Sequence, residues 1–305
     1  MTFYEDPIEQ EEKAPLRLRI LRNLILGWAM FVGLFLLVAL AFVMLFPPVS
    51  AIYNSIVNSG CELGPAHNAR IDIGDTTVLR VVGERGDISI AGRPGMTTVL
   101  VEGQTCAGAE SARYLDLVIL NTSHVGDEII VSVDLPRVGS KLVDDIRMDL
   151  EIFVPTGFPV VEVDSGDGLV FVSDVQELQV SIGFGSLDAT RIGGNVNVEK
   201  LEGSMALINV EGDVMVDTIR GYGEVDLEMI AGNVVIRNNR SGPARISGIG
   251  GDVTIGSAGY GHLDVNGVAG NLSVDENPGG KISLDKIDGS VSVPESLLYT
   301  DGPDA

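Results

Sequence analysis

A phrase of seven residues recurs six times in the second half of this 305-residue chain, and its spacing limits the fold more than any other feature. Each copy has Ile or Val, any residue, Gly, usually Asn or Asp, and then an apolar–x–apolar run. Successive glycines are separated by 18, 20, 19, 19 and 19 residues; they are Gly194, Gly212, Gly232, Gly251, Gly270 and Gly289. So regular a period indicates stacked copies of one small unit.

Each unit supplies two short strands and two turns. Gly followed by Asn or Asp is typical of a turn, because these residues tolerate positive φ and the side chains bond to nearby backbone. The apolar–x–apolar run that follows has the period of a strand with one buried face, and a second such run, for example Val225-Asp226-Leu227, lies between phrases.

One such unit cannot bury its apolar face alone, so the units must stack. The sequence therefore predicts an all-β fold, a parallel β-solenoid over residues 156–295 with about 19 residues per coil. An antiparallel sandwich would also have short alternating strands, but it has no reason to keep this period.

Residues 68–155 are rich in β-forming residues but lack the period, so they are either irregular first coils or a capping β-layer. Residues 137–148 look like a longer loop with room for one helical turn, and residues 296–305 form an acidic tail. The strands expected in this section are Thr77–Val82, Asp87–Ile90, Thr97–Val101, Leu115–Ile119, Glu128–Val133 and Leu150–Val154.

An apolar segment of 23 uncharged residues, 24–46, precedes the β-rich part. A helix of that length reaches roughly 34 Å, enough to cross a bilayer core. Basic residues gather before it, and the next one after it is Arg70; the preceding ones are Lys13, Arg17, Arg19 and Arg22. The positive-inside rule therefore predicts a single-pass protein of the cell membrane, with residues 1–23 cytoplasmic, 47–67 a linker, and the main domain extracytoplasmic.

A rival interpretation is cleavage at Ala51, where Val49-Ser50-Ala51 resembles a signal-peptidase site and would release the domain. The apolar segment is longer than the 7 to 15 residues, roughly, of a signal-peptide core, which favours an uncleaved anchor.

The formal net charge of −23 limits the partners. Phosphate backbones need a Lys/Arg patch to displace their counterions, so nucleic acid is excluded as a partner. Divalent cations and basic proteins suit such a surface better.

The succession of motifs resembles a mostly bacterial group of envelope proteins, the adhesin-like β-repeat domains of unknown function, over about residues 70–293. A Gly-Asp-Ile-Ser-Ile strand at 86–90 comes first, then strands ending in Leu135-Pro136 and Val154-Pro155, then the repeated units. The resemblance implies a parallel β-solenoid with a surface or envelope role, and it carries no catalytic residues. The cysteine pair and the insertion at 137–148 depart from the family pattern.

Cys61 and Cys106 are the only cysteines, and both fall on the predicted exported side, where disulfides persist. A disulfide between them would attach the linker to the first β-layer. The alternative is that both are buried or free thiols. Metal binding by two cysteines alone is not expected.

Acidic residues recur in the predicted turns, and stacked carboxylates could hold Ca²⁺. The nonapeptide pattern of calcium-binding β-rolls is absent, so turn formation and solubility explain them more simply, and no cofactor is assigned. These residues are Asp164, Asp167, Asp188, Asp213, Asp252, Asp264 and Asp275.

No catalytic constellation is evident. Carboxylate pairs mean little in a coil-periodic sequence, because they stack automatically, and His262 has no evident partner set. No basic or aromatic cluster that would hold a sugar is apparent, and Tyr222 and Tyr260 stand as isolated turn residues.

The sequence thus favours a non-catalytic scaffold or binding module of the cell envelope, attached to the membrane by residues 24–46. Its partner is an unknown envelope protein or polysaccharide, and open solenoid ends permit self-association. A transmembrane regulator signalling through residues 1–23 is the alternative, and a polysaccharide-acting β-helix enzyme is the third hypothesis.

Overall fold

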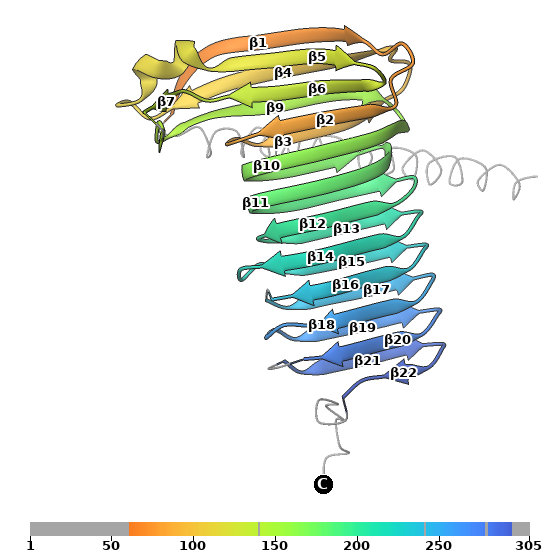
Figure 1. Ribbon diagram of the computed structural model, residues 1–305. Helices are drawn as coiled ribbons and strands as arrows, with labels where there is room; N and C mark the ends of the chain where they lie inside the picture. The colour runs from red at the N-terminus through yellow and green to blue at the C-terminus, as the bar shows by residue number, and fades with distance from the viewer. Residues whose placement is uncertain (1–60, 140, 241, 278–279, 295–305) are drawn as a thin grey trace, which may run out of the picture. The chain divides into compact units, whose positions relative to one another are not determined.

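The computed structural model describes residues 61–139, 141–240, 242–277 and 280–294 (Figure 1). The segments 1–23, 24–46 and 296–305 lie outside these residues, as does Ala51. Within the described ranges there is no helix with the length and apolar character needed to cross a membrane. Residues 61–305 make one compact unit, and the described part of it is built mainly from strands.

Two parallel sheets face each other along the repeats, and we call them face A and face B. Face A contains β12 (Val196–Glu202), β14 (Val214–Arg220), β16 (Val234–Asn239), β18 (Val253–Ser257), β20 (Leu272–Glu276) and β22 (Val291–Ser292). Face B contains β13 (Met205–Val210), β15 (Val225–Ile230), β17 (Ala244–Ile249), β19 (Leu263–Val268) and β21 (Ile282–Ile287).

From β12 to β20, each strand pairs in parallel with the strand one coil before it and with the strand one coil after it. Val214, for example, lies opposite Val196 and Val234, the equivalent valines of the neighbouring coils. The predicted parallel β-solenoid, with a period near 19 residues, is therefore confirmed.

The first coils are formed by two long strands, β10 (Phe158–Ser173) and β11 (Val175–Ile192), which each run through both faces. They pair with each other over almost their whole length. The first half of β10 pairs with β2 (Val78–Gly83) on face A, and its second half pairs with β3 (Ile88–Arg93) on face B. Residues far apart in sequence therefore continue the same solenoid.

The remaining N-terminal strands extend both faces and then end them, and we call this part the cap (Figure 1). On face A, β6 (Glu128–Asp134) pairs in parallel with β2, and β5 (Ile119–Val125) pairs with β6 in the antiparallel sense. On face B, β9 (Ile146–Pro155) follows β3 in parallel, while β4 (Thr98–Ala107) and β1 (Glu62–Asp72) follow in antiparallel order. The N-terminal section thus supplies both a first coil and a capping layer.

Three sequence-based expectations are wrong in the cap. The strand expected at Leu115–Ile119 is largely a 3₁₀ helix, η2 (Ala112–Leu117). The loop expected at 137–148 contains a short antiparallel pair, β7 (Arg137–Val138) with β8 (Lys141–Leu142), and the start of β9.

The predicted linker 47–67 already contains the beginning of β1, which starts at Glu62. β1 pairs only with β4 and is mostly exposed, so its sequence lacks the alternation of a buried strand.

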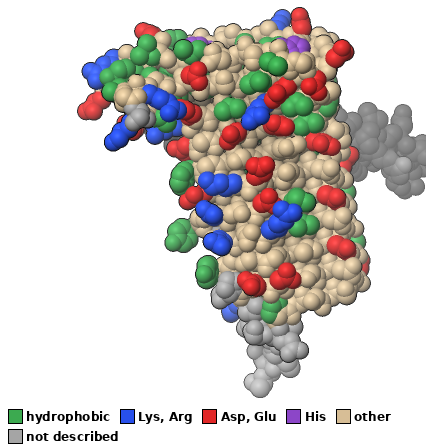
Figure 2. All heavy atoms as spheres, viewed as in Figure 1, with side chains coloured by type: hydrophobic (Ala, Val, Ile, Leu, Met, Phe, Trp, Pro, Cys, Tyr) green, Lys and Arg blue, Asp and Glu red, His purple; other side chains and the backbone are tan. Residues whose placement is uncertain are grey.

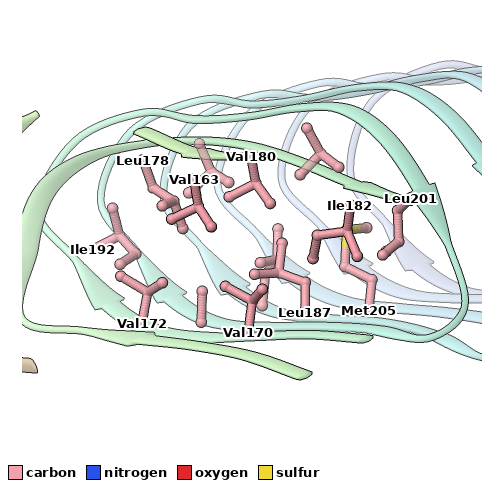
Figure 3. Close-up of a cluster of buried hydrophobic side chains, with 14 of the residues drawn as sticks. Val163, Val170, Val172, Leu178, Val180, Ile182, Leu187, Ile192, Leu201 and Met205 are labelled. Atoms are coloured by element: carbon pink, nitrogen blue, oxygen red, sulfur yellow. The ribbon is translucent and has the colours of Figure 1, made fainter. Parts of the chain in front are cut away.

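The core consists of columns of Val, Ile and Leu that run the length of the solenoid. Figure 3 shows Val163, Val180 and Ile182 pointing from face A toward Val170 and Leu187 on face B. All five are at most 3% exposed. Because equivalent positions stack one coil apart, each apolar side chain is covered by the same kind of side chain above and below it.

The face B strands β13, β15, β17 and β19 each have a third buried position, which simple alternation does not predict. In β13 the residues Met205 and Leu207 point inward, two outward residues follow, and Val210 is buried again. The second outward residue, Asn209, has a left-handed backbone with φ of 59°. The same column has φ between 53° and 72° in the other coils of face B; its members are Asp174, Arg191, Asn209, Met229, Gly248, Gly267 and Lys286. This repeated bulge turns one more apolar residue into the core.

The six repeat glycines serve a purpose different from the one expected. None of them has positive φ. Instead, consecutive glycines stack directly: the N–H of Gly232 donates to the carbonyl of Gly212 at 3.2 Å. A Cβ on Gly232 would lie 2.5 Å from that carbonyl oxygen and 2.6 Å from its carbon. Close approach of one turn to the next, rather than backbone conformation, requires glycine at this position.

We predict that Gly232→Ala lowers the stability of the solenoid by about 1 to 3 kcal/mol, because the new methyl group overlaps backbone that cannot move independently. The measurement is thermal unfolding of the full-length protein, followed by circular dichroism. Ala231→Ser adds one atom to the exposed neighbour in the same turn and is the matched control. Equal unfolding temperatures for the two variants would contradict the steric account.

Candidate functional site

The repeated turns that lead from face B to the next face A strand form one long edge, which we call the Asn/Asp edge. The residue after each repeat glycine forms a column here: Asn195, Asp213, Asn233, Asp252, Asn271 and Ser290. Each side-chain oxygen accepts a hydrogen bond from the backbone N–H of the next member, at 2.7 to 3.0 Å. The column is therefore a continuous ladder that joins six successive turns.

Amide and carboxylate side chains alternate strictly from Asn195 to Asn271. The amide groups of Asn233 and Asn271 each donate to the preceding carboxylate, at 3.0 Å. Two carboxylates are therefore always separated by an amide, and by two coil spacings of ~4.8 Å each. The alternation satisfies the turn backbone without placing like charges in contact.

The acidic residues proposed for calcium are spread over several surfaces. Asp188 and Asp264 lie outside face B, Asp164 lies on face A, and Asp213 and Asp252 belong to the ladder. In the described part of the chain, no group of three or more His, Cys, Asp or Glu side chains could hold a metal ion. The geometry thus assigns these carboxylates to turns and outer faces.

Carboxylates also join the cap to the first coils. Asp149 on β9 accepts the N–H of Asp87 at 2.9 Å, and Asp87 accepts the N–H of Leu169 at 2.9 Å. Burial raises the pKa of Asp149, and the Asp87 N–H and the nearby Arg147 oppose that rise. Because these bonds link β9, the turn before β3 and β10, we assign this half-buried carboxylate a structural role.

An ion pair spans two coils at the left-handed column of face B. Arg191 donates from Nε and Nη2 to the two carboxylate oxygens of Asp174, at 2.7 and 2.6 Å. The Arg191 guanidinium holds the pKa of Asp174 below its usual range. Two residues whose backbones are both left-handed are thus also held by a bidentate contact.

The edge opposite the Asn/Asp edge carries three exposed aromatic side chains. Phe184, Tyr222 and Tyr260 are 59%, 101% and 73% exposed, and each has glycine on both sides. They are separated by 38 residues in each case, which is two coils. We call these three residues the aromatic ridge. Tyr222 and Tyr260 are therefore members of one row, and the expectation that they are isolated is wrong.

Basic side chains lie beside the ridge on successive coils. Arg220 at the end of β14 and Arg240 after β16 stand at equivalent positions of consecutive coils, and both are exposed. Exposed Lys200 in β12 lies two residues before Glu202, the register partner of Arg220; we call these three cations the basic row. Figure 2 shows Lys and Arg side chains gathered next to hydrophobic side chains that project from the left margin, below the cap. Among the described residues, no carboxylate is within ion-pair distance of these three cations.

His262 lies in the turn before β19 on this same edge and is exposed. The surroundings of its side chain do not distinguish it, as an acid or a base, from the other turn residues. The glycine-flanked aromatics were a detectable signal, because three Gly-aromatic-Gly triplets at a spacing of twice the coil period stand in the sequence.

The two cysteines lie together in the cap. Cys61 precedes β1 and is paired with Cys106 of β4, with 5.8 Å between the Cα atoms. This distance is within the range of disulfides. Because β4 lies between β1 and β9, the pair ties the start of the described chain to an interior strand of face B.

The chain matches no known protein-family profile, and no curated protein matches it. Several solved structures are similar in fold. A candidate adhesin of Bacteroides fragilis is 14% identical, with a TM-score of 0.41, over 75% of this chain and 96% of that one.

A candidate cell adhesion protein of Clostridium sporogenes is 13% identical, with a TM-score of 0.29, over 73% and 99%. A candidate lipid-binding protein of Parabacteroides distasonis is 15% identical, with a TM-score of 0.31, over 76% and 98%. Likenesses this distant do not define a function for this chain.

We predict that Asn233→Asp destabilises the solenoid by about 1 to 2 kcal/mol, because it removes an amide donor and places three carboxylates on consecutive coils. The penalty should shrink in high salt, which screens exposed charges. Thermal unfolding at low and high salt measures it. Asp252→Asn keeps every acceptor of the ladder and should change stability by less than about 0.5 kcal/mol. If both variants unfold like the wild type, alternation has no energetic role.

Proposed function

We propose that this chain is a membrane-anchored scaffold that displays a rigid, non-catalytic β-solenoid outside the cytoplasm to bind another component of the cell envelope. The observation that carries the proposal is the stacking of equivalent outward residues on every coil. A ligand that recognises one coil meets similar groups on the next, so a weak contact is repeated along the solenoid.

The membrane anchor and its direction rest on the sequence. Residues 24–46 are uncharged, and four basic residues lie between positions 13 and 22. By the positive-inside rule, the described domain is then extracytoplasmic. The cysteine pair supports this location, since disulfides persist in oxidising compartments.

Rigidity is supported by the continuity of the sheets. Parallel pairing runs without a break from β2 and β3 to the last coil, and the ladder joins the turns of the later coils. Such a body holds its outer surfaces at fixed distances from the cap. A scaffold needs this property, whereas an enzyme needs a site where reactive groups converge. The carboxylates of this domain are dispersed, which favours the scaffold over the polysaccharide-acting enzyme.

The exported location predicts that Cys61 and Cys106 are oxidised in native membranes. A bridge across a separation of 45 residues should stabilise the cap by about 3 to 4 kcal/mol in the chain-entropy model. Thiol alkylation followed by mass spectrometry should label neither cysteine before reduction and both afterwards. Cys106→Ser is the control and should leave Cys61 labelled without reduction. Labelling of both thiols in the unreduced wild type would argue against an oxidising location.

The binding role is tested by crosslinking in native membranes and identifying the captured components. One variant lacks residues 2–16, and another lacks residues 232–269, which removes two coils and joins Ala231 to Gly270 in the same phrase of the repeat. We expect extracytoplasmic partners to depend on the two coils. Loss of a cytoplasmic partner with residues 2–16, with the other partners unchanged, would instead favour a transmembrane regulator.

A further inference from the structure

We propose that the aromatic ridge and the basic row together form a binding track for an extended acidic polysaccharide. This inference rests on the proposed scaffold function and names the class of ligand. Phe184, Tyr222 and Tyr260 supply stacking surfaces for sugar rings. Lys200, Arg220 and Arg240 supply cations for the acidic groups.

The ridge serves no visible purpose in the fold. Tyr222 is 101% exposed and Tyr260 is 73% exposed, so their rings bury almost no surface against the solenoid. An aromatic side chain stabilises a protein mainly through the area that it buries. Aromatic residues make up only 5% of this chain, yet three stand at one equivalent turn position, two coils apart.

The geometry of the ridge suits a polymer. Strands in a sheet lie ~4.8 Å apart, so rings on every second coil are separated by about 10 Å along the solenoid. An extended β-linked glycan repeats after two sugars over a similar length. Since one face of a pyranose ring carries C–H groups, it packs on the π-face of an aromatic ring. Alternate sugars of one straight chain could therefore stack on Phe184, Tyr222 and Tyr260 in turn.

The charges beside the ridge indicate an acidic ligand. The chain as a whole has a net charge of −23, but Lys200, Arg220 and Arg240 occupy three successive coils next to the ridge. Three carboxylates share this edge. Asp167 is the register partner of Phe184, Glu202 is the register partner of Arg220, and Glu224 lies 3.5 Å from Arg245. Arg220 and Arg240 stand on consecutive coils, and among the described residues no carboxylate is within ion-pair distance of either, so they are the cations offered to acidic groups of a ligand.

A membrane surface fits these observations less well. Interfacial binding needs a broad apolar face, whereas the three rings form a single line with glycines and charged residues between them.

The test is binding of the full-length protein, in detergent micelles, to a β-1,4-linked hexaglucuronate, with cellohexaose and phosphatidylglycerol vesicles as comparison probes. We expect binding to the hexaglucuronate that exceeds binding to cellohexaose and weakens with salt. Tyr222→Ala/Tyr260→Ala should weaken it by about fivefold to 150-fold, since two stacked rings at about 0.5 to 1.5 kcal/mol each contribute about 1 to 3 kcal/mol together. Arg220→Gln/Arg240→Gln should weaken it and flatten its dependence on salt.

Met215→Ala/Met229→Ala is the matched control, because both methionines are exposed apolar residues away from the ridge. The aromatic variants should keep the wild-type unfolding temperature. The proposal is overturned if the tyrosine variant binds the hexaglucuronate like the wild type, or if the wild type binds only the vesicles or neither glycan. Crosslinking in native membranes distinguishes the scaffold function from the polysaccharide track. If the tyrosine variant retains the partners of the wild type, the scaffold function is supported and the track is not.

Discussion

Parallel backbone pairing between consecutive coils is the constraint on which the other features of this domain depend. It places each residue directly over its equivalent in the coil before, as Val214 lies over Val196. Whatever stands at a position must therefore tolerate a copy of itself, or of its counterpart, about 4.8 Å away. Apolar residues satisfy this condition by packing, and glycines satisfy it by leaving room. The carboxylates of the ladder satisfy it because the next coil offers a different group.

Several arrangements keep carboxylates on neighbouring coils from repelling one another. Along the Asn/Asp edge, amides separate the carboxylates of Asp213 and Asp252. On face B, Arg191 stands over Asp174 and lowers the pKa of its carboxyl. Where the cap meets the first coil, Asp149 accepts the N–H of Asp87 and lies 3.6 Å from Arg147, and Asp87 in turn accepts the N–H of Leu169. An acidic domain can thus stack its coils without stacking its charges.

The sequence predicted the architecture because a single position, the repeat glycine, carries the period. It did not reveal why glycine is needed there: Gly232 lies against the backbone of Gly212, a contact between coils that local turn rules do not contain. The bulge at Met229 was missed for a related reason, because its left-handed backbone is imposed by the burial of Ile230. β1 was missed because an edge strand that pairs only with β4 has little apolar pattern.

The aromatic ridge and the basic row could be predicted only in part from the sequence. Tyr222 and Tyr260 looked isolated because 38 residues separate them, and the coil period alone shows that this distance is two stacking steps. The cations Arg220 and Arg240 are likewise unremarkable until the turns are placed side by side. By contrast, the pairing of Cys61 with Cys106 was open to sequence reasoning, since no other cysteine competes.

The alternation of Asn and Asp has a consequence for how such a domain can change its length. Gain or loss of one coil between Asn195 and Asn271 would bring two carboxylates, or two amides, into contact at the junction. Gain or loss of two coils would restore the order. Contact between two carboxylates is the unfavourable case, whereas neighbouring amides still supply every acceptor of the ladder. Loss of a single Asn coil, or duplication of a single Asp coil, should therefore be tolerated less well than gain or loss of a pair of coils.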